Sequence, residues 1–488
     1  MTGAQQRPWS PLPSTAADIT RDAVIVVPGI MGSALEDAET GQPLWGLSVN
    51  LLARVWRCRD GLLPLHLTPE ERAGKYGRVR ATGLLRVPAW APFLQGFEPY
   101  GDLVDAVRKV VADPAAILEF PYDWRLPVAV NGAQLAAMAR SHLDAWRAHP
   151  MAGGDDHPVR LVFVAHSMGG LVVRAALAEP DVDLIPDTRT VITLGTPFRG
   201  SVKAAVILNG SRQDPLPVLP RNRMAELAAT LPGVHDLLPD FRCVDAGQEI
   251  YQLTQRDVGM LGGDEELGEQ AQEFRQRMRM SGPQVLPGHR AVVGVAQPTI
   301  QSLRLEGGIV YAQYVGFRPN SDGDLRRNLD GIPERHDRAG DGTVQRDAAS
   351  LGGAGVTYLP LQHGALAKDG VALRYVQAVL TEPDEELGLP LGAGEVGLEV
   401  PDVVETGETW KLRVTGADSP AGILCTVHDA ENDRRLDTPR LRWMDGEIGA
   451  SVTLPSPGLY RVRVDTGGNS PVTQLLLASA PGSGDLDG

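Results

Sequence analysis

The chain has 488 residues and a formal net charge of −15, with 46 Lys and Arg against 61 Asp and Glu. This acidic balance argues against general nucleic-acid binding and against tight electrostatic docking on anionic lipid. Apolar residues make up 43% of the chain and charged residues 22%, which is typical of a globular protein with a substantial core.

The cysteines and the loop motifs predict no bound metal and no cofactor. Cys58, Cys243 and Cys425 lie far apart, match no zinc spacing and are expected to be reduced thiols. No phosphate-binding loop or dinucleotide fingerprint stands out. Residues 1–22 lack the apolar region of a signal peptide and predict a disordered N-terminal segment. No apolar run reaches the ~18 residues of a membrane span, so we expect a cytoplasmic protein.

In chain order, strands alternate with helices from residue 23 to residue 382. The first strand is an unbroken β-branched run at 23–29, a pattern typical of a strand buried on both faces. Further strands are predicted at 115–122, 159–166, 190–197, 289–296, 308–317 and 355–361, and helices at 100–112, 131–146, 169–178 and 364–380. This alternation predicts an α/β domain with a mainly parallel sheet.

Three segments interrupt the alternation. Residues 40–98 are rich in aromatic residues, Leu and Pro, and residues 200–250 are rich in loops. Residues 264–280 form an amphipathic helix pattern, which we expect to pack against the sheet rather than against lipid. The apolar face of that helix carries Leu267, Ala271, Phe274 and Met278.

A second domain is predicted near the C-terminus. Residues 381–397 are rich in Glu, Gly, Pro and Leu, and the pattern beyond them changes from helical to alternating. Several short alternating segments over ~90 residues favour a small all-β sandwich, which we place at 395–479. Residues 480–488 are expected to be a disordered tail.

The segment Ala165-His166-Ser167-Met168-Gly169 lies where a buried strand becomes a helix. In α/β-hydrolases, the nucleophilic serine occupies a strand-to-helix turn with the pattern small-x-Ser-x-Gly, whose small residues let the two backbones approach. Here the first position is Ala instead of Gly, a change of one methyl group that such a turn can accept. We therefore interpret Ser167 as a nucleophile, the alternative being an ordinary polar residue in a tight turn.

A serine nucleophile needs a base and an acid, which follow it in this fold in the order Ser, Asp or Glu, His. The histidines after Ser167 in the α/β region are His235, His289, His336 and His363. His363 follows the last strand and is the predicted base, whereas His289 and His336 are expected to be solvated. Asp341, between two glycines, is the predicted acid, and Asp337 is the alternative.

An oxyanion hole needs two backbone N–H groups. One is expected from Met168, directly after the nucleophile. The other is expected from the loop after the first strand, where Gly29 and Gly32 allow a close backbone turn. Ile30 is the predicted donor, with Met31 as the alternative.

Together these motifs resemble the lecithin:cholesterol acyltransferase family, including bacterial esterase-like members and lysosomal phospholipase. The motifs, in family order, are "PGIMGS", "FPYDWR" (120–125), "VAHSMGG", "TLGTPFRGS" (193–201), "GDGTV" (340–344) and "LQHGAL". The resemblance covers about residues 23–380. It implies an α/β-hydrolase core with Ser167, Asp341 and His363 as triad and Ile30 and Met168 as oxyanion donors. It also implies a lipid-engaging cap at 40–98 and a mobile lid at 200–250.

The same resemblance implies the activity of a serine esterase or lipase. An acyl-serine intermediate would pass its acyl group to water or to an alcohol, and the substrate would be a phospholipid or another lipid ester. The expected contacts are the lipid, a peripheral membrane surface at the cap and a regulatory protein partner, but no nucleic acid. Two alternatives are a recruitment module that uses the β-domain and an esterase for small soluble esters. The "YDWR" segment is expected to be structural, with Asp123 and Arg125 forming an ion pair.

Overall fold

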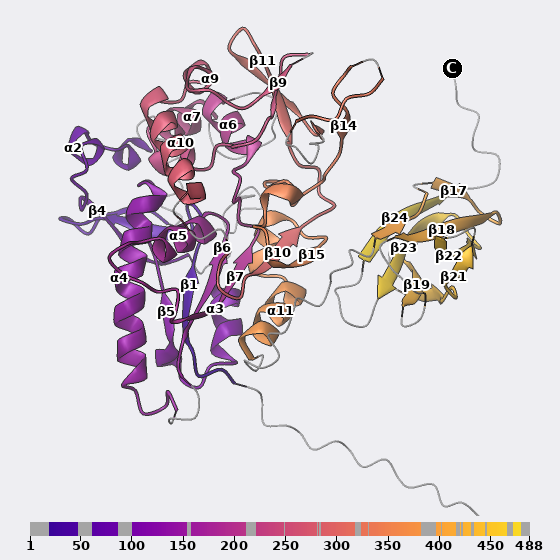
Figure 1. Ribbon diagram of the computed structural model, residues 1–488, viewed down its shortest axis with the longest axis horizontal. Helices are drawn as coiled ribbons and strands as arrows, with labels where there is room; N and C mark the ends of the chain where they lie inside the picture. Colours follow the sequence, from indigo (N-terminus) through magenta and orange to yellow (C-terminus); the bar gives the residue numbers. More distant parts are fainter. Residues whose placement is uncertain are drawn as a thin grey trace, which may run out of the picture.

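The computed structural model (Figure 1) describes most of the chain. The described residues are 19–46, 61–85, 100–153, 158–210, 221–247, 249–280, 282, 285–317, 324–329, 331–381, 397–401, 403–415, 420, 423–430, 434–444, 447–465 and 472–479. Among them, no helix combines the length and the apolar character needed to cross a bilayer.

A six-stranded parallel sheet forms the centre of the first domain. Its strands, in spatial order, are β15 (Gly355–Leu359), β10 (Arg290–Gly294), β7 (Thr188–Leu194), β6 (Leu161–His166), β1 (Ala23–Val27) and β5 (Ile117–Glu119). Every residue of β1, β6 and β7 is buried, as expected for unbroken apolar runs in a parallel sheet. The predicted α/β-hydrolase architecture is confirmed.

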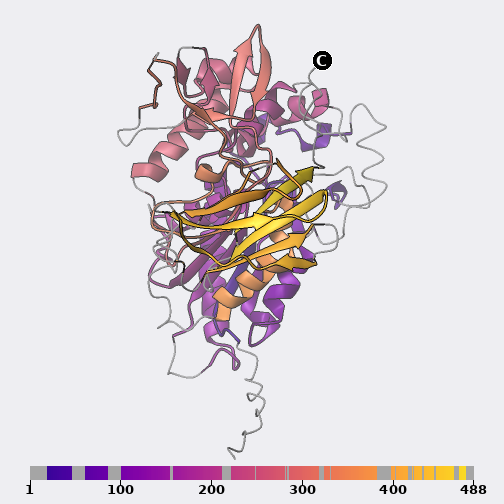
Figure 2. The same cartoon turned by 90° about the vertical axis from the view of Figure 1, so that its right-hand side faces the viewer.

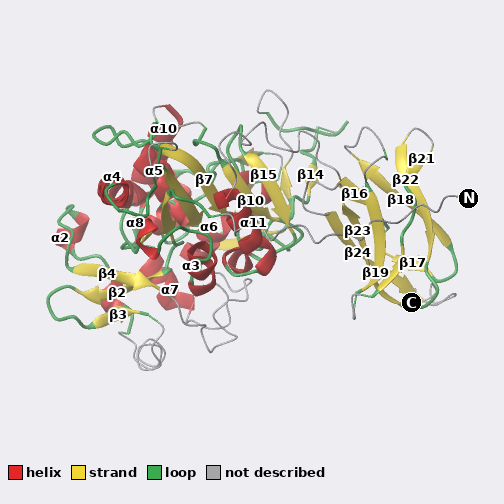
Figure 3. Ribbon diagram, turned by 90° about the horizontal axis from the view of Figure 1, so that it is seen from below, coloured by secondary structure: helices red, strands yellow, loops and turns green. Residues whose placement is uncertain are grey.

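Helices cover this sheet (Figure 3). Helices α4 (Val128–Arg147) and α5 (Met168–Leu177) pack together and against β1, and α3 (Gly101–Arg108) packs against α11 (Gly370–Thr381). Because all six strands run in one direction, their carboxyl ends share one edge of the sheet. The loops after β1, β6, β7 and β15 therefore meet at that edge, where ligands of open α/β sheets bind.

The described part of the predicted cap is a small sheet. Strands β3 (Pro43–Trp45), β2 (Ser33–Asp37) and β4 (Val79–Leu84) pair antiparallel, with η1 (Leu63–Leu65) and α2 (Pro69–Arg72) in the connection. Nearly half of the predicted cap, at 47–60 and 86–98, lies outside the described residues. Trp45 is only 4% exposed and contacts Trp124 edge-on, so this cap tryptophan belongs to the core rather than to a lipid-facing surface.

Above the carboxyl edge in Figure 1 lies a second group of elements. They are α6 (Val202–Asn209), α7 (Arg221–Ala228), α8 (Pro232–His235), β8 (Val244–Asp245), β9 (Ile250–Tyr251), α9 (Gln255–Met260), α10 (Glu265–Met280), β11 (Ser302–Glu306) and β12 (Ile309–Gln313). The strand expected at 308–317 is present as β12, which lies outside the main sheet and pairs with β11 in a separate sheet of order β12-β11-β8-β9. One prediction is wrong here. Helix α10 packs against α8 and α9 instead of the main sheet.

Shorter elements complete the first domain. They are η2 (Pro114–Ala116), β13 (Gly316–Phe317), β14 (Arg335–His336), η3 (Arg346–Ala348) and η4 (His363–Ala367). The predicted disordered segment 1–22 ends in ordered structure: Thr20 bridges to Val111, and Asp22 forms a 2.5 Å ion pair with Arg189. Asp22 is held there because the guanidinium also donates to the Leu380 carbonyl at the end of α11. Residues 1–18 lie outside the described residues.

The C-terminal region is an all-β sandwich, as predicted. One sheet has the order β16 (Gly397–Glu399), β18 (Thr409–Thr415), β22 (Glu447–Thr453), β21 (Arg442–Met444). The other has the order β17 (Val403–Glu405), β24 (Val472–Ser479), β23 (Gly458–Asp465), β19 (Leu424–Asp429), β20 (Arg435–Asp437). Figure 2 shows these strands in orange and yellow, facing the viewer.

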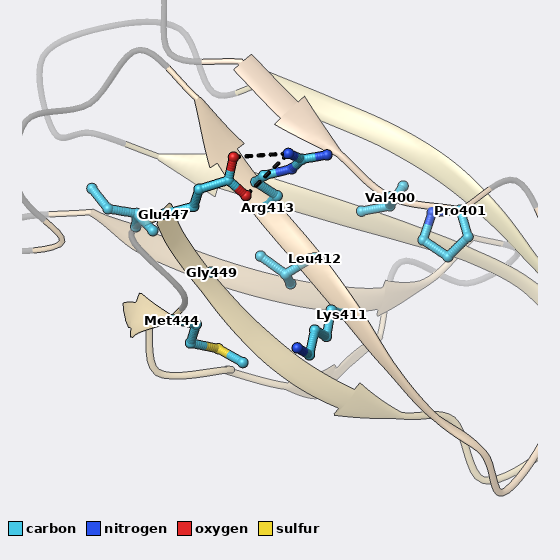
Figure 4. Close-up of a pocket in the computed structure, with 9 residues that line it drawn as sticks. Val400, Pro401, Lys411, Leu412, Arg413, Met444, Glu447 and Gly449 are labelled. Atoms are coloured by element: carbon cyan, nitrogen blue, oxygen red, sulfur yellow. Dashed lines mark hydrogen bonds and ion pairs between the residues drawn. The ribbon is translucent and has the colours of Figure 1, made fainter.

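The sandwich has a hydrophobic core of its own, which includes Trp410, Val427 and Leu476. On its first sheet lies an open hollow of about 510 Å³ (Figure 4). An exposed ion pair between Arg413 and Glu447 at 2.9 Å lies at the hollow.

Candidate active site

Ser167 lies in the sharp turn between β6 and α5. Its backbone has φ 53° and ψ −129°, a strained conformation for a residue with a side chain. The turn is held because the Ser167 N–H donates to the Leu194 carbonyl at the end of β7 (2.9 Å), and the Ser167 carbonyl accepts from Gly170 N–H (3.1 Å). A serine in such a strained strand-to-helix turn is the arrangement of an α/β-hydrolase nucleophile.

The glycines after Ser167 are required by close backbone approach. A Cβ on Gly169 would lie 2.5 Å from the Pro28 carbonyl oxygen, and one on Gly170 would lie 2.1 Å from Thr196 Oγ1. Neither space accepts a methyl group. Ala165, in the first small position of the motif, is fully buried in β6, so the fold tolerates the extra methyl group there.

The structure brings Ser167, His363 and Asp341 into one hydrogen-bonded chain. His363 Nε2 lies 2.9 Å from Ser167 Oγ, and His363 Nδ1 lies 2.7 Å from Asp341 Oδ2. The carboxylate fixes the imidazole with its proton on Nδ1, which leaves Nε2 free to accept the serine proton. These are the three residues that the order of motifs predicts, contributed by the loops after β6 and β15 and by the segment between β14 and η3.

Asp341 is held from its other side by backbone groups. Its Oδ1 accepts from the N–H groups of Thr343 (2.9 Å) and Val344 (2.7 Å), and its carbonyl accepts from His363 N–H (2.8 Å). The tight loop needs Gly340, since a Cβ there would lie 1.9 Å from the Val344 carbonyl oxygen. The alternative acid, Asp337, instead accepts from Gln301 Nε2 at 2.6 Å.

The loop after β1 lies against the nucleophile. A Cβ on Gly29 would come within 2.8 Å of the Ser167 Cβ, so only glycine allows this approach. Gly32 N–H donates to the Gly29 carbonyl (3.1 Å), which closes a turn around Ile30 and Met31. Among the described residues, no hydrogen bond involves the N–H of Ile30, Met31 or Met168. Met31 has a positive φ of 62°.

Aromatic side chains hold this loop in place. Tyr122 Oη donates to the Pro28 carbonyl (2.9 Å), Trp45 Nε1 to the Met31 carbonyl (3.0 Å) and Trp124 Nε1 to the Ser33 carbonyl (3.2 Å). The "YDWR" segment, predicted to be structural, thus also fixes the loop beside Ser167.

The ion pair predicted between Asp123 and Arg125 is present, and it includes a third residue, Glu71. Arg125 is fully buried and bonds Asp123 (2.7 Å) and Glu71 (2.9 Å) of α2. Burial alone would lower the pKa of Arg125, but the two carboxylates raise it above its usual value. The guanidinium therefore stays charged and joins α2 to the core below the site.

Two further histidines differ from the prediction of solvated residues. His289 is only 3% exposed, and its Nε2 lies 2.9 Å from Thr193 Oγ1, because it enters the sheet directly before β10. Burial lowers its pKa to about 4. His336 is half-buried in β14 and accepts from Arg338 Nε (3.1 Å).

Residues that the sequence did not single out also shape the site. Gly195, with φ 60°, passes directly beneath the acid and the base: a Cβ there would lie 3.0 Å from Asp341 Oδ2 and 3.1 Å from His363 Nδ1. Tyr100 contacts both the loop after β1 and His166. Gly195 lies in the quoted "TLGTPFRGS" motif and could have been inferred from its position after a strand, whereas no local pattern marks Tyr100.

Comparison with known proteins agrees with the motifs. Residues 78–256 match the family model "Lecithin:cholesterol acyltransferase", so the resemblance inferred from the sequence is confirmed over this range. No curated protein sequence matches the chain. Similar solved structures include a chain of the Tle4-Tli4 complex, with 14% identity, a TM-score of 0.43 and coverage of 75% of this chain and 98% of that one. The propeptide form of the lipase BlEst2 from Bacillus licheniformis has 14% identity, a TM-score of 0.34 and coverage of 96% and 95%. Phospholipase PlaB from Legionella pneumophila has 10% identity, a TM-score of 0.24 and coverage of 94% and 89%.

Proposed function

We propose that this chain, with its match to the lecithin:cholesterol acyltransferase family over residues 78–256, is a serine esterase that cleaves acyl esters through an acyl-Ser167 intermediate. The family match supports an esterase or acyltransferase activity. The observation that carries the serine mechanism is the continuous set of hydrogen bonds from Ser167 Oγ through His363 to Asp341.

Acylation begins when Ser167 Oγ attacks the ester carbonyl carbon and its proton moves to His363 Nε2. The carbonyl oxygen becomes an oxyanion, to which the N–H groups of Ile30 and Met168 donate. When the tetrahedral intermediate collapses, the bond to the alkoxy oxygen breaks and that oxygen takes the proton from Nε2. The alcohol leaves, and the acyl group remains on Ser167.

Deacylation repeats these steps with a second oxygen nucleophile. Water or an alcohol gives its proton to His363 Nε2 and attacks the acyl carbon, and Ser167 Oγ recovers the proton as it leaves. Asp341 stabilises the imidazolium that forms twice in each cycle. The buried, twice hydrogen-bonded position of its carboxylate suits this role.

For the substrate we propose a lipid ester, in keeping with the name of the matched family. A direct test compares turnover of a phospholipid in liposomes with turnover of a short soluble ester. An increase in rate on liposomes is expected. A rate that liposomes do not raise would favour an esterase for small soluble esters.

The test of the mechanism is Ser167→Ala. This variant should keep the fold and lose at least about 10³-fold in kcat, since residual catalysis without the nucleophile comes only from binding and oxyanion donors. Turnover of p-nitrophenyl butyrate and mass spectrometry of lipid extracts incubated with each protein measure the loss. Ser141→Ala is the matched control, because Ser141 is exposed on α4 and bonds only within its helix. Ester cleavage by Ser167→Ala at the wild-type rate would refute the assignment.

A further inference from the structure

A second chain of hydrogen bonds runs beside the Ser167–His363–Asp341 chain. Gly29 N–H lies 2.7 Å from Tyr100 Oη, Tyr100 Oη lies 2.9 Å from His166 Nδ1, and His166 Nε2 lies 3.1 Å from the His363 carbonyl oxygen. Tyr100 and His166 are 1% and 2% exposed. The chain therefore joins the loop after β1 to the backbone of the proposed base through two buried side chains.

The direction of each hydrogen bond follows from the groups at its two ends. A backbone N–H only donates and a carbonyl only accepts, so Gly29 donates to Tyr100 and His166 Nε2–H donates to His363. With its one proton on Nε2, neutral His166 must accept at Nδ1, and the Tyr100 hydroxyl donates there. Every donor has an acceptor, and each link fixes the orientation of the next.

His166 remains neutral under all ordinary conditions. Burial is the main cause, with repulsion from His363 second, and together they lower the pKa of His166 to about 3. Its ring lies 4.9 Å from that of His363, centroid to centroid. A neutral ring can act only as a fixed donor and acceptor, so His166 does not compete with His363 for the serine proton.

These hydrogen bonds join three segments whose relative positions matter for the proposed reaction. Gly29 directly precedes Ile30, His166 directly precedes Ser167, and the His363 main chain carries the base. His363 is thus held on both sides of its backbone, since its N–H donates to the Asp341 carbonyl at 2.8 Å. Oxyanion donors and bases work only when held within a few tenths of an ångström of the reacting atoms.

We infer that Tyr100 and His166 are positioning residues that hold the oxyanion loop and the His363 backbone in register with Ser167. The inference rests on the proposed esterase function. The partners of this hydrogen-bonded series at its two ends are backbone groups of Gly29 and His363, so both side chains act through these residues. Their loss should lower the rate of chemistry while substrate binding is retained.

The test uses the full chain and the soluble ester p-nitrophenyl butyrate. Tyr100→Phe removes the acceptor of Gly29 N–H and the donor to His166 but keeps the ring. We expect kcat to fall about 10- to 100-fold, somewhat less than the loss of a whole oxyanion donor, with KM within about threefold. His166→Leu should behave in the same way. Tyr100 and His166 belong to one series of hydrogen bonds, so breaking it at either residue should have a similar effect. The loss of kcat in the double variant should therefore be about that of the worse single variant, not the product of the two losses.

Two matched variants separate positioning from general destabilisation. Thr193→Val removes a buried hydroxyl of the main sheet, the partner of His289, and leaves Gly29 and His166 paired, so its loss in kcat should stay within about threefold. His289→Leu removes another buried neutral histidine, one that bonds Thr193, and should leave kcat unchanged. Melting temperatures of all variants show that each is folded at the assay temperature.

The outcomes distinguish this inference from the proposed function. If Tyr100→Phe and His166→Leu keep the wild-type kcat while Ser167→Ala is inactive, positioning by these residues is wrong and the serine mechanism stands. Multiplied losses in the double variant, or an equal loss in Thr193→Val, would also overturn it. If Ser167→Ala retains turnover, the proposed function itself fails.

Discussion

Asp341 uses its two carboxylate oxygens for different purposes. Oδ1 accepts two backbone N–H groups and thereby fixes the side chain, while Oδ2 faces His363 Nδ1. The backbone groups can only donate, so any replacement must keep an acceptor at Oδ1. An asparagine satisfies this condition with its carbonyl oxygen and then turns its NH₂ group toward His363.

Asp341→Asn is therefore expected to keep the fold and lose activity. With an amide donor facing Nδ1, the imidazole must carry its proton on Nε2, where it can no longer accept from Ser167. The expected loss in kcat is about 10²- to 10⁴-fold, by the tautomer argument for Ser-His-Asp triads. Steady-state kinetics on a soluble ester measure it. Asp337→Asn is the control and should keep kcat, and a reversal of the two results would exchange the roles of Asp341 and Asp337.

At the residue scale, the sequence predicts residues that belong to a local motif or follow a fixed order along the chain. It does not predict residues that are distant in the sequence and meet only in the folded structure. Ser167, Asp341 and His363 follow from a turn motif and a fixed chain order. Tyr100 lies 71 residues from Gly29 and 66 from His166, and no local pattern links them. His289 was placed in solvent because it precedes a strand, although its neighbour Thr193 lies on another strand of the sheet.

Among the elements, helix α4 begins without a capping side chain of its own. The N-cap residue is Pro127, which makes no side-chain hydrogen bond, and the first N–H, of Val128, donates instead to Asp236 Oδ2 at 2.7 Å. Asp236 directly follows α8, so the predicted lid region supplies the cap of a core helix. Burial raises the pKa of Asp236 to about 6, although the Val128 N–H lowers it.

The raised pKa of Asp236 makes the free energy of unfolding fall as the pH rises. Between about pH 4 and pH 6 the native state binds the Asp236 proton more tightly than the unfolded state does. The contribution of Asp236 is therefore fully present below its unfolded pKa of 3.8 and is lost as pH rises through about 6. At neutral pH the buried carboxylate costs about 1–3 kcal/mol of unfolding free energy.

Asp236→Asn should accordingly stabilise the protein at pH 7.5 by about 1–3 kcal/mol and change little at pH 4.5, since the amide still accepts from Val128 without a buried charge. Asp236→Ala should be about 1–2 kcal/mol less stable than Asp236→Asn at both pH values, because it lacks the cap. Urea unfolding at both pH values measures these differences. A stabilisation by Asn that is the same at both pH values would mean that Asp236 is ionised in the native state throughout.

At the element scale, short unbroken β-branched runs predict the strands of the main sheet, because strands buried on both faces are apolar along their whole length. The strand expected at 308–317 is present as β12 but lies in a separate sheet, which the strand pattern does not predict. Strand β12 is mostly half-exposed and pairs with β11 antiparallel, and such a pairing depends on a neighbour that the strand pattern does not specify. Helix α10 likewise carries its apolar face as predicted but buries it against other helices.

On the scale of the whole molecule, the residues that the structure describes form two separate large hydrophobic cores. One comprises residues between Ala23 and Leu380, and the other comprises residues between Leu398 and Ala478, with no residue in common. Ser167, His363, Asp341 and the loop after β1 all belong to the first part. A core that is closed within one part of the chain can fold and unfold as a unit of its own.

Truncation after residue 390 is therefore expected to leave the catalytic part intact. Turnover of a soluble ester should remain within about twofold of the full chain, because no residue of either hydrogen-bonded chain at the site comes from the sandwich. Calorimetry should show two transitions for the full chain and only the catalytic one after truncation. Ser167→Ala in the truncated chain is the control for background hydrolysis. A truncated protein that is folded but turns over far more slowly would show that the sandwich contributes to catalysis, and one that fails to fold would show that the two cores depend on each other.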